Sequence, residues 1–300
     1  FFKISKIEII CFKTGICFFC IKTNVEDTNK FSDILNFNYK FRDSNAEDIN
    51  HLKKYENIRL QNNTFSDVRA LGDLIKDITG TRIENKQLNL DTNRFYTHSY
   101  TCIDQENWND ENEFEKIEFE FLKYANIAPS AHKTAFKKKE TQILSNSKFV
   151  RIGFSKQGTT LFTTGKDPYH YTKLPDTFEK EYLYTYILNL YKKIYLNKIE
   201  NEFKNPLKTK IARQKFVQFT KNVWVQEITN DDEGSQINET YKTTLELDKI
   251  YNNLKSKYDL AYKELNIEKT SKINKYILIL LILSLLLNLL NFAVLMKMPH

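Results

Sequence analysis

Three polar residues interrupt an otherwise apolar segment near the carboxyl end of the 300-residue chain. Ser284, Asn288 and Asn291 lie within residues 276–296, which contain no charged residue and no proline. Their spacing of four and then three residues places them on one side of an α-helix. A bilayer offers an asparagine amide no partner, so this stripe indicates a helix–helix interface or a wet pore lining, in which amides replace part of a cation's hydration shell. The alternative is a lone membrane anchor that tolerates polar residues.

A second group of residues carries the chemistry of metal binding. Acidic side chains are frequent from residue 104 to residue 120, beginning with Asp104, Glu106, Asp110 and Glu111. Hard divalent cations such as Mg²⁺ and Ca²⁺ prefer carboxylate oxygen, so these four residues are candidate ligands. Their spacing matches no EF-hand loop, and a water-facing helix surface is the alternative interpretation.

The four cysteines, Cys11, Cys17, Cys20 and Cys102, offer a weaker signal. Cys17 and Cys20 have the C-x-x-C spacing, but they lie in a run that reads as a strand, where residues three apart point to opposite faces. No second pair completes a zinc site. We therefore expect reduced structural cysteines, which favours a reducing compartment.

Motifs of enzymes are missing from the sequence, which has no glycine-rich phosphate loop, no G-x-S-x-G and no H-E-x-x-H. The five histidines are scattered, and His98 is expected to be structural. The net charge of +7 arises from 45 basic and 38 acidic side chains, without a compact arginine-rich patch. We therefore expect neither an enzyme nor a nucleic-acid-binding protein, and no bound cofactor.

The apolar segment itself has the length of a membrane span. A hydrocarbon core about 30 Å thick needs roughly 20 residues in a helix, and residues 276–296 meet that length. Four lysines precede the segment and one follows it: Lys263, Lys269, Lys272 and Lys275, against Lys297. Lysine and arginine residues that flank a span are enriched on its cytoplasmic side. We therefore expect a protein of the cell membrane with residues 1–275 in the cytoplasm.

The preceding sequence predicts an α+β fold. Residues 6–23 and 148–164 read as two hairpins in one sheet, the first of them a buried central pair, and residues 94–103 as a strand. Helices are expected at 31–41, 64–78, 112–124, 175–203 and 207–229, with a surface turn at 230–235. This gives an α/β domain at 1–174, a helical or coiled-coil stalk at 175–275 and a transmembrane helix at 276–296.

A heptad seam leads toward the apolar segment. Its residues recur at spacings of four and three: Leu247, Tyr251, Leu254, Tyr258, Ala261 and Leu265. Such a seam is produced by self-assembly or by antiparallel pairing with the preceding helix, and both interpretations stay open. No glycine or proline separates the seam from the span, so residues 240–296 are expected to form a nearly continuous helix.

The order of parts from residue 148 onward resembles the CorA-type divalent-cation transporter superfamily. A strand pair (KFVRIGF, TTLFTTG) precedes a tyrosine-rich helix (EKEYLYTYILNLYKKIYLNKIENEF), a second helix (ARQKFVQFTKNVWVQEI) and a long helix entering the membrane. The resemblance implies a cytoplasmic α/β domain, a pore-lining span and assembly into pentamers. The family's Gly-Met-Asn signature is absent, because the corresponding place reads AVLMKMPH. The family also has a second span, which in this protein would have to lie beyond His300.

Two functions follow as expectations. The first is a CorA-like, homo-oligomeric membrane protein that transports divalent cations, with Mg²⁺ as the transported or regulatory ion, or that acts as a channel or effector gated by a small molecule. The second is a single-pass scaffold or adaptor tethered to membrane lipid, with no transport activity.

Overall fold

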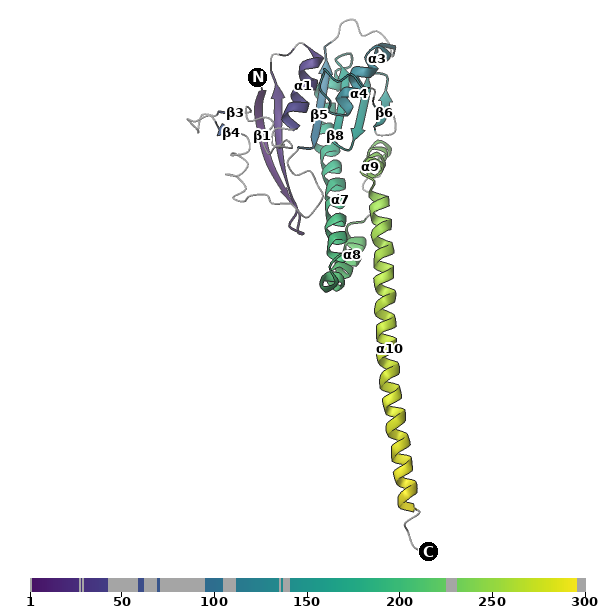
Figure 1. The fold of residues 1–300 in the computed structure, drawn as a ribbon. Coiled ribbons are helices and arrows are strands. Elements are labelled where there is room, and N and C mark those ends of the chain that lie inside the picture. The colour runs from purple at the N-terminus through teal and green to yellow at the C-terminus, as the bar shows by residue number, and fades with distance from the viewer. Residues whose placement is uncertain are drawn as a thin grey trace.

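The computed structural model describes residues 2–26, 28, 30–42, 59–61, 69–70, 95–104, 112–134, 136, 141–224 and 231–295. These residues form an α+β amino-terminal part, which contains sheets and packed helices, and a long apolar helix at the carboxyl end (Figure 1). The predicted α+β class is confirmed at this level.

A four-stranded sheet is the centre of the α+β part. Its strands are β5 (Thr97–Ile103), β6 (Gln142–Ser147), β7 (Val150–Ser155) and β8 (Gly158–Thr164), in the spatial order β5-β8-β7-β6. β7 and β8 form the predicted second hairpin, with Ile152 opposite Leu161. β5 is the strand predicted at 94–103, and it lies parallel to β8.

Helices cover both faces of this sheet. Leu161 and Phe162 are neighbours on β8 and point to opposite faces, as the alternation of a strand requires. Phe162 packs among side chains of α1 (Phe31–Arg42), α3 (Asn112–Lys116) and α4 (Glu118–Ala125). Leu161 packs among side chains of α6 (Leu174–Thr177), α7 (Leu183–Phe203) and α9 (Asp232–Thr244). The helices predicted at 31–41 and 112–124 are thus present, the latter broken at Ile117.

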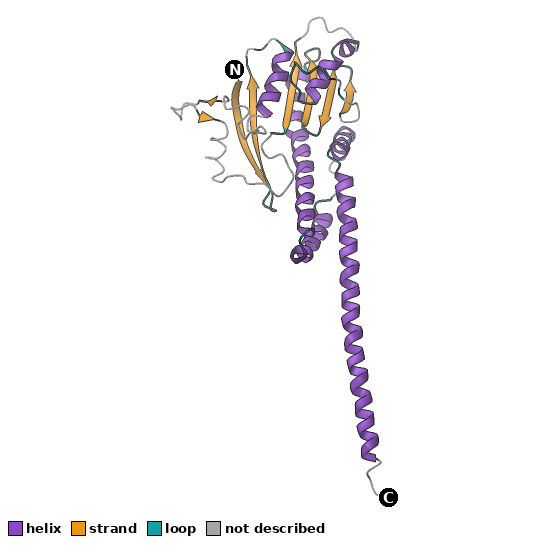
Figure 2. Cartoon of the chain, viewed as in Figure 1, coloured by secondary structure: helices purple, strands orange, loops and turns teal. Residues whose placement is uncertain are grey.

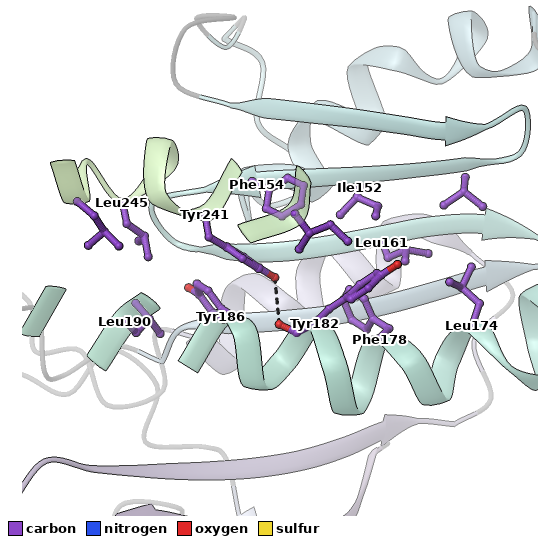
Figure 3. Close-up of a cluster of buried hydrophobic side chains, with 13 residues drawn as sticks. Ile152, Phe154, Leu161, Leu174, Phe178, Tyr182, Tyr186, Leu190, Tyr241 and Leu245 are labelled. Carbon is purple, nitrogen blue, oxygen red and sulfur yellow. Dashed lines mark hydrogen bonds between the residues drawn. The ribbon is translucent and has the colours of Figure 1, made fainter. Parts of the chain in front are cut away.

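The core on the α7 side is rich in tyrosine (Figure 3). Phe154 of β7 meets the ring of Tyr241 edge-on at 5.0 Å, and Tyr241 stacks on Tyr186 at 5.1 Å. The Tyr241 hydroxyl donates a long hydrogen bond of 3.5 Å to the carbonyl oxygen of Tyr182. This core joins side chains from Val150 to Leu247, and so contains residues on both sides of position 174, where the sequence places a domain boundary.

The first hairpin is present but is placed differently from the prediction. Among the described strands, β1 (Phe2–Cys11) and β2 (Cys17–Val25) pair only with each other, and Gly15 supplies the positive φ of the turn. The prediction of one sheet containing both hairpins is wrong, because the edge of β8 is occupied by β5. The hairpin is also not buried. Phe2 instead contacts Phe37 of α1, while Phe12 in the turn stacks on Tyr191 of α7 at 3.9 Å.

A long helical run leads away from the sheet. α6 continues through a π-helical turn at Phe178–Tyr182 into α7, in agreement with the helix predicted at 175–203. Asn205 and Pro206 end this run, and a 3₁₀ turn at Pro206–Lys208 leads into α8 (Thr209–Asn222). The two helices form an antiparallel pair, because the short connection leaves little room for any other arrangement. Residues 225–229 of the predicted second helix lie outside the described residues.

Three sequence predictions need correction in the remaining segments. The helix predicted at 64–78 lies mostly outside the described residues, and its described pair, β4 (Arg69–Ala70), is instead paired with β3 (Arg59–Leu60). The predicted surface turn at 230–235 is in its described part the start of α9, because the Asp231 carboxylate accepts a hydrogen bond of 2.8 Å from the Gly234 backbone and caps the helix. The helix predicted over 240–296 is interrupted at residues 245–246.

Candidate functional site: a stalk helix that continues into an apolar segment

The last helix, α10 (Leu247–Leu295), extends over 49 residues and continues far beyond the packed part of the chain (Figure 2). At 1.5 Å per residue it is about 73 Å long. It is unbroken between Leu265 and Tyr276, as predicted, so the stalk and the apolar segment form a single rod.

The amino-terminal turns of α10 are anchored in the protein core. Leu247 and Leu254 are fully buried, while Tyr251 and Tyr258 are partly buried against α7 and α8. These are four of the six residues of the predicted heptad seam. The structure therefore uses this part of the seam for packing within the chain, which was one of the two interpretations that the sequence left open.

Aromatic rings fasten α10 to α8. Tyr251 stacks on Trp224 with ring centroids 4.3 Å apart, and its hydroxyl donates a hydrogen bond of 3.3 Å to Thr220. Phe216 of α8 contacts the rings of both Tyr251 and Tyr258, at 5.4 and 5.5 Å. An ion pair between Lys257 and Glu200 adds a link to α7. Ring contacts of this kind contribute about 0.5–1.5 kcal/mol each beyond the area they bury.

A sharp junction sets the direction in which α10 leaves the core. Glu246, between α9 and α10, has a φ of +57°, in the left-handed region that a non-glycine residue rarely adopts. Its carboxylate accepts a hydrogen bond of 3.3 Å from Lys156 in the β7–β8 turn. That contact holds the pKa of the Glu246 carboxyl below its ordinary value. The junction therefore connects the sheet directly to the first turn of the stalk.

From Asn266 to Leu290 every residue of α10 is exposed among the residues that the structure describes. From Tyr276 to Leu290 the large apolar side chains are exposed by between 44% and 68%. Within the described residues, α10 is the helix long and apolar enough to cross a membrane. Leaving such a surface in water is costly at about 25 cal/mol per Å², so this segment requires an apolar environment.

The polar stripe of the sequence is present on this segment. Ser284 and Asn288 are exposed on α10, and Asn291 lies one turn further along the same helix. None of the other described elements covers Ser284 or Asn288, so the structure does not bring these two residues together with a binding partner.

The acidic candidates give no metal site among the described residues. Asp104 is exposed directly after β5, while Glu106, Asp110 and Glu111 lie outside the described residues. In the part of the chain that the structure describes, no group of three or more His, Cys, Asp or Glu side chains is arranged to hold a metal ion. The water-facing surface expected on the following helix is present, because Glu115 and Glu118 are exposed while Phe114 and Phe121 are buried.

The cysteine prediction is wrong for one pair. Cys11 and Cys17 are directly opposite in the β1–β2 register and are joined as a disulfide, while Cys20 and Cys102 are free. The C-x-x-C pair of the sequence drew attention to Cys17 and Cys20, whereas the hairpin register brings Cys17 to Cys11. Both paired cysteines are exposed, so the compartment decides whether the disulfide persists.

Two further polar side chains, His98 and Lys192, lie away from the candidate site. His98 was expected from the sequence to be structural, whereas the burial of Lys192 was not predicted. The His98 ring stacks on Phe178 at 3.8 Å and its Nε2–H donates to the Phe178 carbonyl oxygen at 2.9 Å, which confirms a structural histidine. Burial lowers the pKa of His98 to about 4. On α7, Lys192 is only 1% exposed. Burial, together with the neighbouring Lys242, lowers the pKa of Lys192 to about 8. Neither group adjoins the apolar segment.

Comparisons with known proteins identify no relative. No protein-family profile, curated protein or solved structure matches this chain.

Proposed function

We propose that this chain is an integral membrane protein whose α10 helix crosses the bilayer and connects it rigidly to the α+β part. The observation that carries the proposal is the continuity of α10 from the buried Leu247 to Leu295. A movement at the Glu246 junction would be transmitted along the rod, because a helix without a glycine or proline hinge has no point at which to bend sharply.

The function that this arrangement supports best is controlled passage of cations through an assembly of α10 helices, as in a CorA-like transporter or a channel gated by a small ligand. Ser284, Asn288 and Asn291 provide uncharged oxygen atoms along one side of the span, and such atoms replace part of a cation's hydration shell. Mg²⁺ is the first ion to examine, because the layout of the chain resembles CorA-type proteins.

A membrane-tethered scaffold is the second candidate. It is favoured by the packing of Leu247, Tyr251 and Leu254 inside the chain, since this packing satisfies part of the seam that self-assembly would otherwise use. A tether needs only the apolar length of the span and gives no role to its polar stripe.

Ion flux separates the two candidates. Purified protein in liposomes loaded with a Mg²⁺-sensitive dye should admit Mg²⁺, and Asn288→Leu combined with Asn291→Leu should abolish the influx. Leu286→Ala combined with Leu290→Ala, on other faces of the same helix, is the matched control and should leave flux intact. Absence of flux from wild-type protein across a panel of divalent cations and cytosolic nucleotides would refute conduction. Membrane association of the asparagine double variant at the wild-type level would then support the scaffold.

The orientation in the membrane is the second part of the proposal. The four lysines that precede the span, against Lys297 beyond it, favour a cytoplasmic α+β part. The Cys11–Cys17 disulfide does not support this orientation, because disulfides are rare in reducing compartments, so the orientation rests on the lysine asymmetry. Protease added to intact cells should leave the α+β part uncut and should digest it after permeabilisation. Digestion in intact cells would reverse the orientation.

A further inference from the structure

The position of the polar stripe around α10, relative to the packed core, identifies the face that is free to meet another molecule. Successive residues of an α-helix are about 100° apart around its axis. Measured from the buried Leu254, Ser284 lies about 120° around the helix, Asn288 about 160° and Asn291 about 100°. The polar stripe therefore does not continue the seam that packs on α7 and α8.

The same face continues along α10 on the amino-terminal side of the apolar segment. Tyr262, Asn266, Thr270 and Ile273 lie at about 80°, 120°, 160° and 100° from Leu254. Tyr262 and Ile273 are large apolar residues that are 47% and 56% exposed, although they precede the apolar segment. We call these four residues, together with Ser284, Asn288 and Asn291, the association face.

We propose that the association face packs against the same face of a second copy of this chain. The inference rests on the proposed placement of α10 in a bilayer, which gives all copies the same orientation and brings like residues to the same depth. An asparagine amide both donates and accepts hydrogen bonds. The Asn288 amides of two copies can therefore hydrogen-bond to each other, whereas lipid tails offer them no partner. Tyr262 and Ile273 then lose water-exposed apolar surface in the same contact.

The position of the α+β part permits this contact. α7 and α8 cover the Leu254 side of α10, and Arg213 of α8 also lies over one side of the Tyr262 ring. Asn266 and Ile273 are exposed in the part of the chain that the structure describes. Two or more α10 helices can thus meet along the association face while each α+β part lies to the side of the contact. Interhelical hydrogen bonds in bilayers contribute only about 0.6 kcal/mol each, so the apolar residues above the span are a necessary part of the interface.

Site-directed crosslinking tests the proposed face. Single cysteines are introduced into the full chain at Asn266→Cys and Ile273→Cys, with Glu268→Cys and Lys272→Cys as matched controls. The control positions are exposed residues of the same stretch, on the Leu254 side at about −40° and 0°. The native cysteines are replaced by serine, and the protein is reconstituted in liposomes and oxidised. If the serine background does not fold, a photo-crosslinking residue at the same four positions keeps the native cysteines.

The expected result is a covalent dimer at Asn266→Cys and Ile273→Cys that is several-fold more abundant than at either control. Equal crosslinking at all four positions, or none at any, would overturn the proposed face. The result is independent of conduction. Crosslinking at the association face without ion flux supports the assembly and refutes only the channel, whereas flux without this crosslinking pattern refutes only the face.

Discussion

The indole ring of Trp224 and the phenol ring of Tyr251 are stacked with centroids 4.3 Å apart and planes 6° apart. Trp224 lies two residues beyond the end of α8, and Tyr251 lies in the second turn of α10, so this pair joins the end of α8 to the start of α10. Leu254, one turn beyond Tyr251, is fully buried in the same cluster. The stalk is thus held by a short aromatic contact region rather than along its length.

Removing one ring of this pair should weaken the packing of α10 against α8. Trp224→Ala is expected to destabilise the folded protein by about 2–4 kcal/mol, because it deletes a large packed ring and leaves a cavity beside Tyr251. Leu260→Ala, at a position of α10 that is 60% exposed, should change stability by less than about 0.5 kcal/mol. Thermal unfolding of the detergent-solubilised protein by circular dichroism measures both. Equal midpoints for the two variants would contradict the anchoring role of Trp224.

The left-handed backbone at Glu246 gives a prediction that compares two small residues. Glu246→Gly and Glu246→Ala both lose the exposed ion pair with Lys156, but only glycine adopts a φ of +57° without strain. The glycine variant should therefore be more stable than the alanine variant by about 1 kcal/mol. A glycine variant no more stable than the alanine variant in the same unfolding measurement would show that residue 246 is not held in this conformation.

His98 makes the stability of the α+β part depend on pH. Its pKa of about 4 in the folded state lies below the ordinary value of 6.5, because burial disfavours the charged ring. The unfolded chain therefore binds the proton more readily. The contribution of His98 is fully present above pH 6.5 and is lost as the pH falls toward 4.

Replacing the ring isolates this contribution. Between pH 7.5 and 5 the wild-type protein should lose about 2 kcal/mol more stability than His98→Gln, whose amide retains a donor for the Phe178 carbonyl oxygen without titrating. Denaturant unfolding at the two pH values gives the comparison. Parallel pH dependence of the two proteins would mean that His98 is already accessible to protons in the fold.

Local sequence patterns predict many of the elements, and their failures have physical causes. β7 and β8 follow from alternation and a short turn, and α7 from its apolar face and the break at Pro206. The separate location of β1 and β2 could not be predicted, because a hairpin pattern does not specify which strand occupies the edge of β8. The interruption at Glu246 was missed because a glutamate in left-handed conformation gives no local signal.

The candidate site on α10 was also predictable only in part, because local patterns do not specify packing partners. Residues 276–296 indicate a membrane span by their length and composition alone, and the stripe of Ser284, Asn288 and Asn291 follows from helical spacing. The partner of Leu247 and Leu254 could not be chosen from the sequence, because a heptad seam packs equally well within a chain or between chains. The buried Lys192 was also missed, since a lysine on an amphipathic helix normally reaches water.

Membrane extraction tests the central claim most directly, namely that the apolar part of α10 is embedded in a bilayer. Membranes from cells that express the full chain are washed with alkaline carbonate and floated on a density gradient. The wild-type protein should stay with the lipid. A variant with Leu283→Lys and Leu287→Lys should be released, because each lysine at the centre of a span costs about 2.5–3.5 kcal/mol. Release of the wild-type protein by carbonate, to the same extent as this variant, would contradict a membrane-spanning α10.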